Sequence, residues 1–219
     1  MRKGRASVRV RYLFYFLFLF LIGLSLMLYS FYLSGVISES NFIAITSIAQ
    51  SFIFSLIAIC YMLIKGYNLN GIVAGLGLSR KSIGIMTVVI GIALFLVIFA
   101  LEIGIGAFTA ATGIQLPTNV QQVLGGLPLY FLIFSVVVAP INEEILFRGF
   151  LVPRWGIIIS ALVFGFLHYL SYLSLSEFIA AFVFGLAAGY VRKRTNSLYP
   201  SIMAHMLVNL IAILALLAL

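Results

Sequence analysis

The sequence contains no aspartate, a single cysteine and few charged residues of any kind. Of its 219 residues, 8% are charged and 64% are hydrophobic, whereas soluble domains carry about 25% charged residues. This deficit excludes an ordinary soluble domain and favours an all-α polytopic membrane protein. Cys60 has no second cysteine with which to form an internal disulfide. The lack of aspartate also excludes a catalytic pair of aspartates.

Long apolar runs take the place of the missing charges. A run of about 20 apolar residues is enough for a helix to cross a hydrocarbon core of roughly 30 Å. We predict about seven transmembrane helices in a single transmembrane domain over residues 1–219. The first is expected to be a retained helix and not a cleaved signal. The predicted spans are 13–35, 42–64, 83–106, 127–147, 156–173, 178–191 and 199–218.

The positive charges follow these spans. All 13 Lys and Arg residues precede the first span or lie after the second, fourth or sixth. Seven spans place every one of them on the same side, which the positive-inside rule assigns to the cytoplasm together with the N-terminus. The net charge of +8 is then explained by topology and by contact with the lipid bilayer. We therefore expect no nucleic-acid partner.

Several polar side chains lie inside the predicted spans. A charged side chain in the membrane costs about 2.5–3.5 kcal/mol on insertion scales, so each is by default a hypothesis of function. Glu102 stands alone near the outer end of the third span and is assigned no role. The others cluster in the second half of the chain and are Glu143, Glu144, Arg148, His168, His205 and Asn209.

Helical spacing separates the two adjacent glutamates. Glu144 and Arg148 are at positions i and i+4, so they can pair on one face, and such a buried pair could be purely structural. Glu143 points about 100° away and has no local partner. Pro140 removes one backbone hydrogen bond nearby, so it predicts either a kink that opens a wet pocket or a simple packing kink.

The histidines lie on two further spans. His205 and Asn209 share one helical face, which must look into the bundle. His168 alone could equally be an interhelical hydrogen-bond partner. Counting from Arg154, His168 lies about 14 residues or roughly 21 Å deep, against roughly 9–17 Å for Glu143 and His205. A single site therefore requires tilted helices or a later helix start.

A carboxylate, two imidazoles and an amide together can activate water and stabilise an oxyanion. Two histidines and a carboxylate are also a known catalytic zinc set, although the HExxH signature is absent. Both chemistries stay open at this point.

Three motifs resemble those of the CPBP family of intramembrane proteases, which includes the type II CAAX prenyl endopeptidases and the bacterial Abi proteins. They are "EEILFR" at 143–148, "FGFLH" at 164–168 and "HMLVN" at 205–209. Each motif is weak alone, but three in order on three spans are fairly specific. The resemblance covers residues 130–212 and implies a catalytic core at 127–212.

The resemblance implies peptide-bond hydrolysis within the membrane. By this likeness Glu143 and His168 activate the water, while His205 and Asn209 stabilise the oxyanion. The family has been described both as metalloproteases and as metal-independent glutamate proteases. We favour a glutamate-activated water without a cofactor.

The resemblance also implies supporting residues and a metal set. Glu144 and Arg148 would orient the site, and Phe164 would shape it by packing. If zinc is present instead, its ligands would be Glu143, His168 and His205.

The expected substrate is a membrane-associated protein or peptide, with prenylated and lipid-anchored proteins among the candidates. The pocket is expected to be reached from the cytoplasmic half, and the oligomeric state is left open. Two alternatives remain. One is a non-catalytic scaffold or immunity-type protein of the same fold, and the other is a proton-coupled transporter, which the lack of internal repeats disfavours.

Overall fold

The computed structural model describes residues 3–114 and 120–218, and every regular element in these ranges is helical. The prediction of an all-α protein is therefore confirmed. The elements are α1 (Lys3–Leu33), α2 (Glu39–Ile64), α3 (Leu69–Leu76), the 3₁₀ turn η1 (Arg80–Ser82), α4 (Ile85–Thr112), α5 (Val120–Gly125), α6 (Leu129–Glu144), the π-helical segment η2 (Ile145–Leu151), α7 (Val152–Tyr172), α8 (Leu175–Thr195) and α9 (Tyr199–Leu217).

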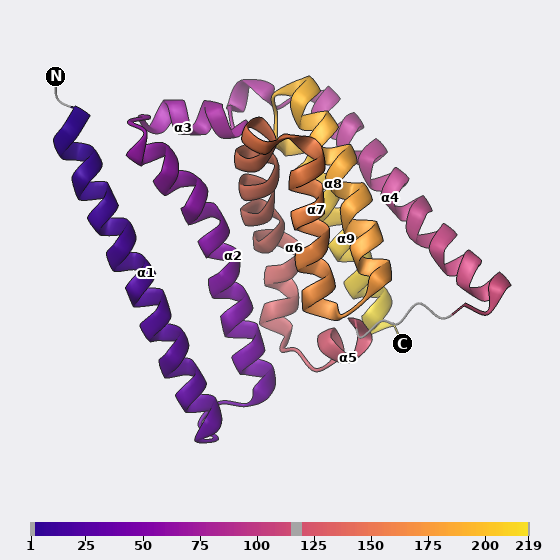
Figure 1. The fold of residues 1–219 in the computed structure, drawn as a ribbon. Helices are drawn as coiled ribbons and strands as arrows, with labels where there is room; N and C mark the ends of the chain where they lie inside the picture. Colours follow the sequence, from indigo (N-terminus) through magenta and orange to yellow (C-terminus); the bar gives the residue numbers. More distant parts are fainter. Residues whose placement is uncertain (1–2, 115–119, 219) are drawn as a thin grey trace.

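Five helical segments in the described ranges are long and apolar enough to cross a membrane: α2, α4, the 44-residue run Leu129–Tyr172, α8 and α9. The long run reverses direction at Gly156, whose φ of 86° and ψ of 173° are not helical. As a result α6 and α7 run in opposite directions (Figure 1). The chain is thus an integral multi-pass membrane protein, and the count of seven spans stays a prediction.

The sixth predicted span, 178–191, was too short. Helix α8 has 21 residues, because Ser174 caps its N-terminus by accepting a hydrogen bond from the Glu177 backbone N–H at 3.2 Å. Glu177 therefore belongs to the first turn of α8 and does not interrupt an apolar run. The predicted loop 107–126 is also partly helical, since it contains the end of α4 and all of α5.

Small residues bring α7 and α8 together. A Cβ atom on Gly185 would lie 2.8 Å from the Cα and Cβ atoms of Ala161, and one on Gly189 would lie 2.9 Å from Ile157 Cγ2. No side chain larger than hydrogen fits at these positions without movement. Small residues at such positions let two membrane helices approach closely.

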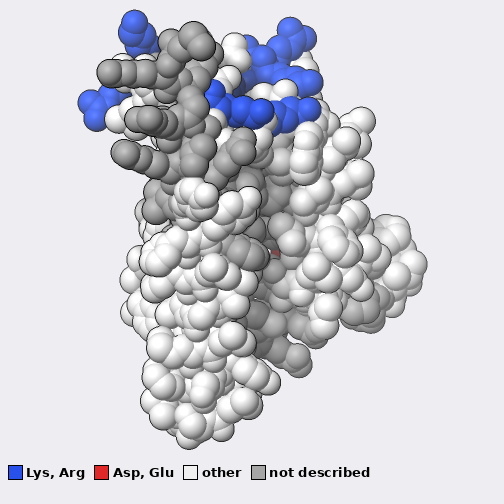
Figure 2. All heavy atoms as spheres, turned by 60° about the vertical axis from the view of Figure 1, so that its left-hand side comes forward, with Lys and Arg blue, Asp and Glu red and all other residues white. Residues whose placement is uncertain are grey.

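The short helix α3 lies across one end of the bundle (Figure 1). It is tied to the turn between α8 and α9, where Arg192 Nη2 donates to the Gly75 carbonyl at 2.9 Å and the Leu198 N–H donates to the Gly77 carbonyl at 2.9 Å. Figure 2 shows Lys and Arg side chains gathered at this same end. We call it the basic end; it comprises the segments 65–84, 148–156 and 192–198, and we refer to them below as the basic loops.

Candidate active site

Helix α6 loses its regular hydrogen bonding as it approaches the paired glutamates. Pro140 is buried inside α6 and has no N–H to donate. After Glu144 the chain continues as the π-helical segment η2, in which all seven residues are buried. Such segments often occur at functional sites. The sequence indicated a disturbance at Pro140, but no pattern in it predicted the π-helical turn.

Glu143, His168 and His205 meet at one point. One ligand-type atom from each lies within 4.8 Å of the others, although the residues come from α6, α7 and α9. This meeting resolves the sequence-based concern about unequal depths. The kink at Gly156 in α7 contributes, because His168 lies only 12 residues, or about 18 Å at 1.5 Å per residue, beyond it.

His205 lies between the two glutamates and is buried. Its Nδ1 is 3.2 Å from Glu144 Oε1, and its Nε2 is 3.8 Å from Glu143 Oε2. A carboxylate accepts, so Nδ1–H donates to Glu144 and Nε2 faces Glu143. The contact with Glu144 was not predicted, because the two partners are 61 positions apart in the sequence and share no helical spacing.

A backbone carbonyl orients His168. Its Nδ1 lies 3.0 Å from the carbonyl oxygen of Phe164. A carbonyl can only accept, so this contact assigns the proton of the neutral ring to Nδ1 and leaves a lone pair on Nε2. The Phe164 ring also packs on the imidazole with 4.3 Å between ring centroids. Phe164 therefore fixes both the tautomer and the position of His168.

Asn209 lies one turn below His205 on α9 and faces the same cavity. Its Nδ2 donates to the Ser135 carbonyl on α6 at 2.9 Å. A side-chain amide has two N–H groups, so the second is free to serve a ligand while the first holds the orientation.

Arg148 forms the predicted pair with Glu144. Nη1 lies 2.9 Å from Glu144 Oε1, and both side chains are almost fully buried. The N–H is not aligned on the oxygen, so the contact is an ion pair without a hydrogen bond. The guanidinium also rests on aromatic rings, with its carbon 4.1 Å from the Phe164 centroid and 4.9 Å from that of Phe184. These contacts hold Glu144 against His205.

The site lies in a cavity of about 360 Å³ that all four predicted catalytic residues line. Figure 2 shows an acidic atom deep in a hollow at mid-height of the molecule. The walls also include Glu102, which sequence analysis set aside, and Glu177. Neither residue was among the predicted site residues.

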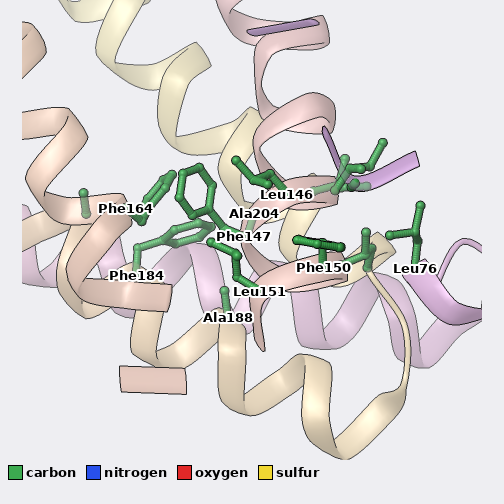
Figure 3. Close-up of a cluster of buried hydrophobic side chains, with 14 of the residues drawn as sticks. Leu76, Leu146, Phe147, Phe150, Leu151, Phe164, Phe184, Ala188 and Ala204 are labelled. Atoms are coloured by element: carbon green, nitrogen blue, oxygen red, sulfur yellow. The ribbon is translucent and has the colours of Figure 1, made fainter. Parts of the chain in front are cut away.

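The cavity extends away from the basic end, and the expectation that the pocket is reached from the cytoplasmic half stays a prediction. None of its lining residues belongs to the basic-end loops. Side chains of these segments belong instead to a packed apolar cluster, which includes Leu76, Phe150, Leu151 and Ala188 (Figure 3).

Residues 125–211 match the family model described as type II CAAX prenyl endopeptidase Rce1-like. This segment of the chain is similar to the Rce1-like family. The match confirms the suspected CPBP relationship, and all the predicted site residues fall within it. No curated protein and no solved structure gives a significant match. The Rce1-like segment supplies α6 to α9, while the cavity is completed by side chains from α2, α4 and α5 that lie outside the match.

Proposed function

We propose that this protein is an intramembrane endopeptidase that hydrolyses a peptide bond of a membrane-associated substrate. The observation that carries the proposal is the meeting of Glu143, His168 and His205 at the end of a cavity within an Rce1-like segment. A carboxylate and an imidazole that lie side by side in a largely apolar protein are suited to activating a water molecule.

The first step uses Glu143 and His168. A water molecule donates one hydrogen bond to the Glu143 carboxylate and another to His168 Nε2, which carries the lone pair when the neutral ring donates Nδ1–H to the Phe164 carbonyl. The water oxygen attacks the carbonyl carbon of the scissile bond, and its proton passes to Glu143. That proton then moves to the leaving nitrogen as the C–N bond breaks, giving an amine and a carboxylic acid.

The developing oxyanion accepts hydrogen bonds from Asn209 and His205. Asn209 donates through its second amide N–H. His205 donates through Nε2 when both ring nitrogens carry protons, with Nδ1–H held by Glu144. Removing one such donor costs about 10²–10³ in kcat in enzymes of this kind of chemistry. Arg148 acts one step further away, by holding Glu144 in place.

The same three residues also fit a zinc ion. Metal-bound histidines usually donate their second N–H to a carboxylate or a backbone carbonyl, as His205 does to Glu144 and His168 does to Phe164. A zinc ion held there would supply Lewis-acid activation of water. We favour the metal-free route, because Glu143, Asn209 and the two histidines already provide a base and oxyanion donors.

The test compares Glu143→Gln with wild type in cells that express the protein. New protein N-termini in the membrane fraction are identified by mass spectrometry. The proposal expects a set of termini that is lost in Glu143→Gln. The matched control is Glu39→Gln, which makes the same change at an exposed position on the first turn of α2 and should leave that set unchanged.

The two rival functions give different results. A non-catalytic scaffold yields no termini that depend on Glu143, although Glu143→Gln folds and performs its cellular role. A proton-coupled transporter drives ion-dependent flux in liposomes without any peptide product. Either outcome contradicts the proposal.

A further inference from the structure

The cavity runs away from the basic end. On α2, whose N-terminus lies at the opposite end, the lining residues fall in the first 16 of its 26 residues and include Ser47 and Gln50. On α7, which runs the other way, they fall in the second half and end at Tyr172. Both patterns place the walls in the half of the molecule farthest from the basic loops.

The far end of the cavity is lined by residues from the ends of helices. Glu177 is in the first turn of α8, and Leu124 and Leu127 belong to α5 and the turn after it. In Figure 1, α5 and the turn between α7 and α8 lie at the end opposite α3. The cavity therefore extends from the site toward the end of the bundle that carries no Lys or Arg among the described residues.

Apolar packing closes the other direction. Phe147 and Phe164 are each 1% exposed and form the end wall next to the site. Behind them, Arg148, Leu76 and Leu198 are at most 1% exposed. A peptide could reach Glu143 from the basic end only if this close-packed layer came apart, and such layers do not yield continuously.

The chemistry of the walls suits a peptide. Hydroxyl and amide groups recur along the cavity, at Ser47, Gln50, Ser135 and Ser171. They alternate with aromatic and aliphatic side chains, as in sites that combine burial with a few polar contacts. An extended peptide presents N–H and C=O groups at every residue, and these need such partners once they leave water.

We propose that the substrate enters as an extended peptide segment from the end opposite the basic loops, and that this is the extracytoplasmic end. The assignment to a membrane side follows from the positive-inside rule, which places the Lys and Arg loops in the cytoplasm. The inference depends on the proposed function only in treating the bound peptide as a substrate. The direction of access is a property of the fold alone. The substrates are then membrane proteins with a segment on the extracytoplasmic side.

Thiol accessibility tests the direction without requiring activity. The only cysteine is Cys60, so a Cys60→Ala background gives a chain without thiols. Ser47→Cys and Ser171→Cys report the cavity from two different helices. Ser34→Cys, in the exposed turn between α1 and α2, and Lys81→Cys, at the basic end, report the two ends of the bundle.

A charged, membrane-impermeant maleimide is added to intact cells and, separately, to inverted membrane vesicles. The proposal expects both cavity cysteines to react from the side on which Ser34→Cys reacts and not to react from the other side. That side should be the outside of intact cells. Reaction from the Lys81→Cys side, or from neither side, overturns the proposal.

A second measurement keeps this inference separate from the proposed function. Labelling of Ser171→Cys should abolish the cleavage that depends on Glu143, because the attached reagent fills the entrance. The cavity cysteines could react from the expected side while the Glu143→Gln variant yields the same products as wild type. That result would contradict the proposed function and leave the direction of access in place. Full cleavage by the labelled protein would contradict entry by this route.

Discussion

The buried pair of Glu144 and Arg148 should contribute measurably to the free energy of unfolding. Replacing Arg148 with Met keeps most of the side-chain volume but leaves Glu144, which is 0% exposed, without its cation. Removing one partner of a buried pair costs about 3–5 kcal/mol. His205, 3.2 Å from the same carboxylate oxygen, offsets part of this, and Met retains contacts of its own with the Phe164 and Phe184 rings. We expect a loss of about 3 kcal/mol of unfolding free energy.

A double variant separates the lost charge from the lost packing. Adding Glu144→Gln to Arg148→Met removes the orphaned carboxylate, so the double variant should recover to within about 1–2 kcal/mol of wild type. The matched control is Arg154→Met, because Arg154 is exposed and rests on the Phe150 ring at 4.1 Å. Its contacts are worth about 0.5–1 kcal/mol. Equilibrium unfolding in lipid bicelles measures all three. A double variant no more stable than the single one would refute the reasoning.

Three further predictions concern packing, the oxyanion and metal. Gly185→Ala should lower the free energy of unfolding by about 1–3 kcal/mol, because its Cβ would lie 2.8 Å from Ala161, whereas Gly104→Ala, with no atom within 4 Å, should behave as wild type in the same unfolding assay. Asn209→Ala should lower kcat about 10²–10³-fold with little change in KM or in folding. A rise of the same size in KM with unchanged kcat would instead assign Asn209 to substrate binding. Cleavage by purified protein should survive chelation, and stoichiometric zinc that is lost in His205→Ala by elemental analysis would show that the metal-free route is wrong.

Local patterns predicted most of the fold and part of the site. Helix positions followed from apolar runs, and the contact of Glu144 with Arg148 followed from its spacing of one turn. Contacts between distant helices left no such pattern. The bond from His205 to Glu144 and the position of Glu102 in the cavity wall could be seen only in the folded chain.

The direction in which the cavity extends could not be predicted from the sequence for a related reason. Arg148 and Arg154 mark the basic end, and their closeness to Glu143 along the chain suggested access from that side. The space beside them is filled by Phe147, Phe164 and the cluster behind them. Whether apolar side chains fill a region or line an opening depends on packing in three dimensions, which composition does not reveal.

The most direct test of the account is cleavage by purified protein reconstituted in liposomes. The substrate is one found by the comparison of N-termini, and the reaction is run in heavy-oxygen water. The account predicts that wild-type protein places one heavy oxygen atom in the new carboxyl group of the product, and that folded Glu143→Gln yields no product. Cleavage by Glu143→Gln at the wild-type rate, or a product without heavy oxygen, would contradict hydrolysis by a water molecule that Glu143 activates.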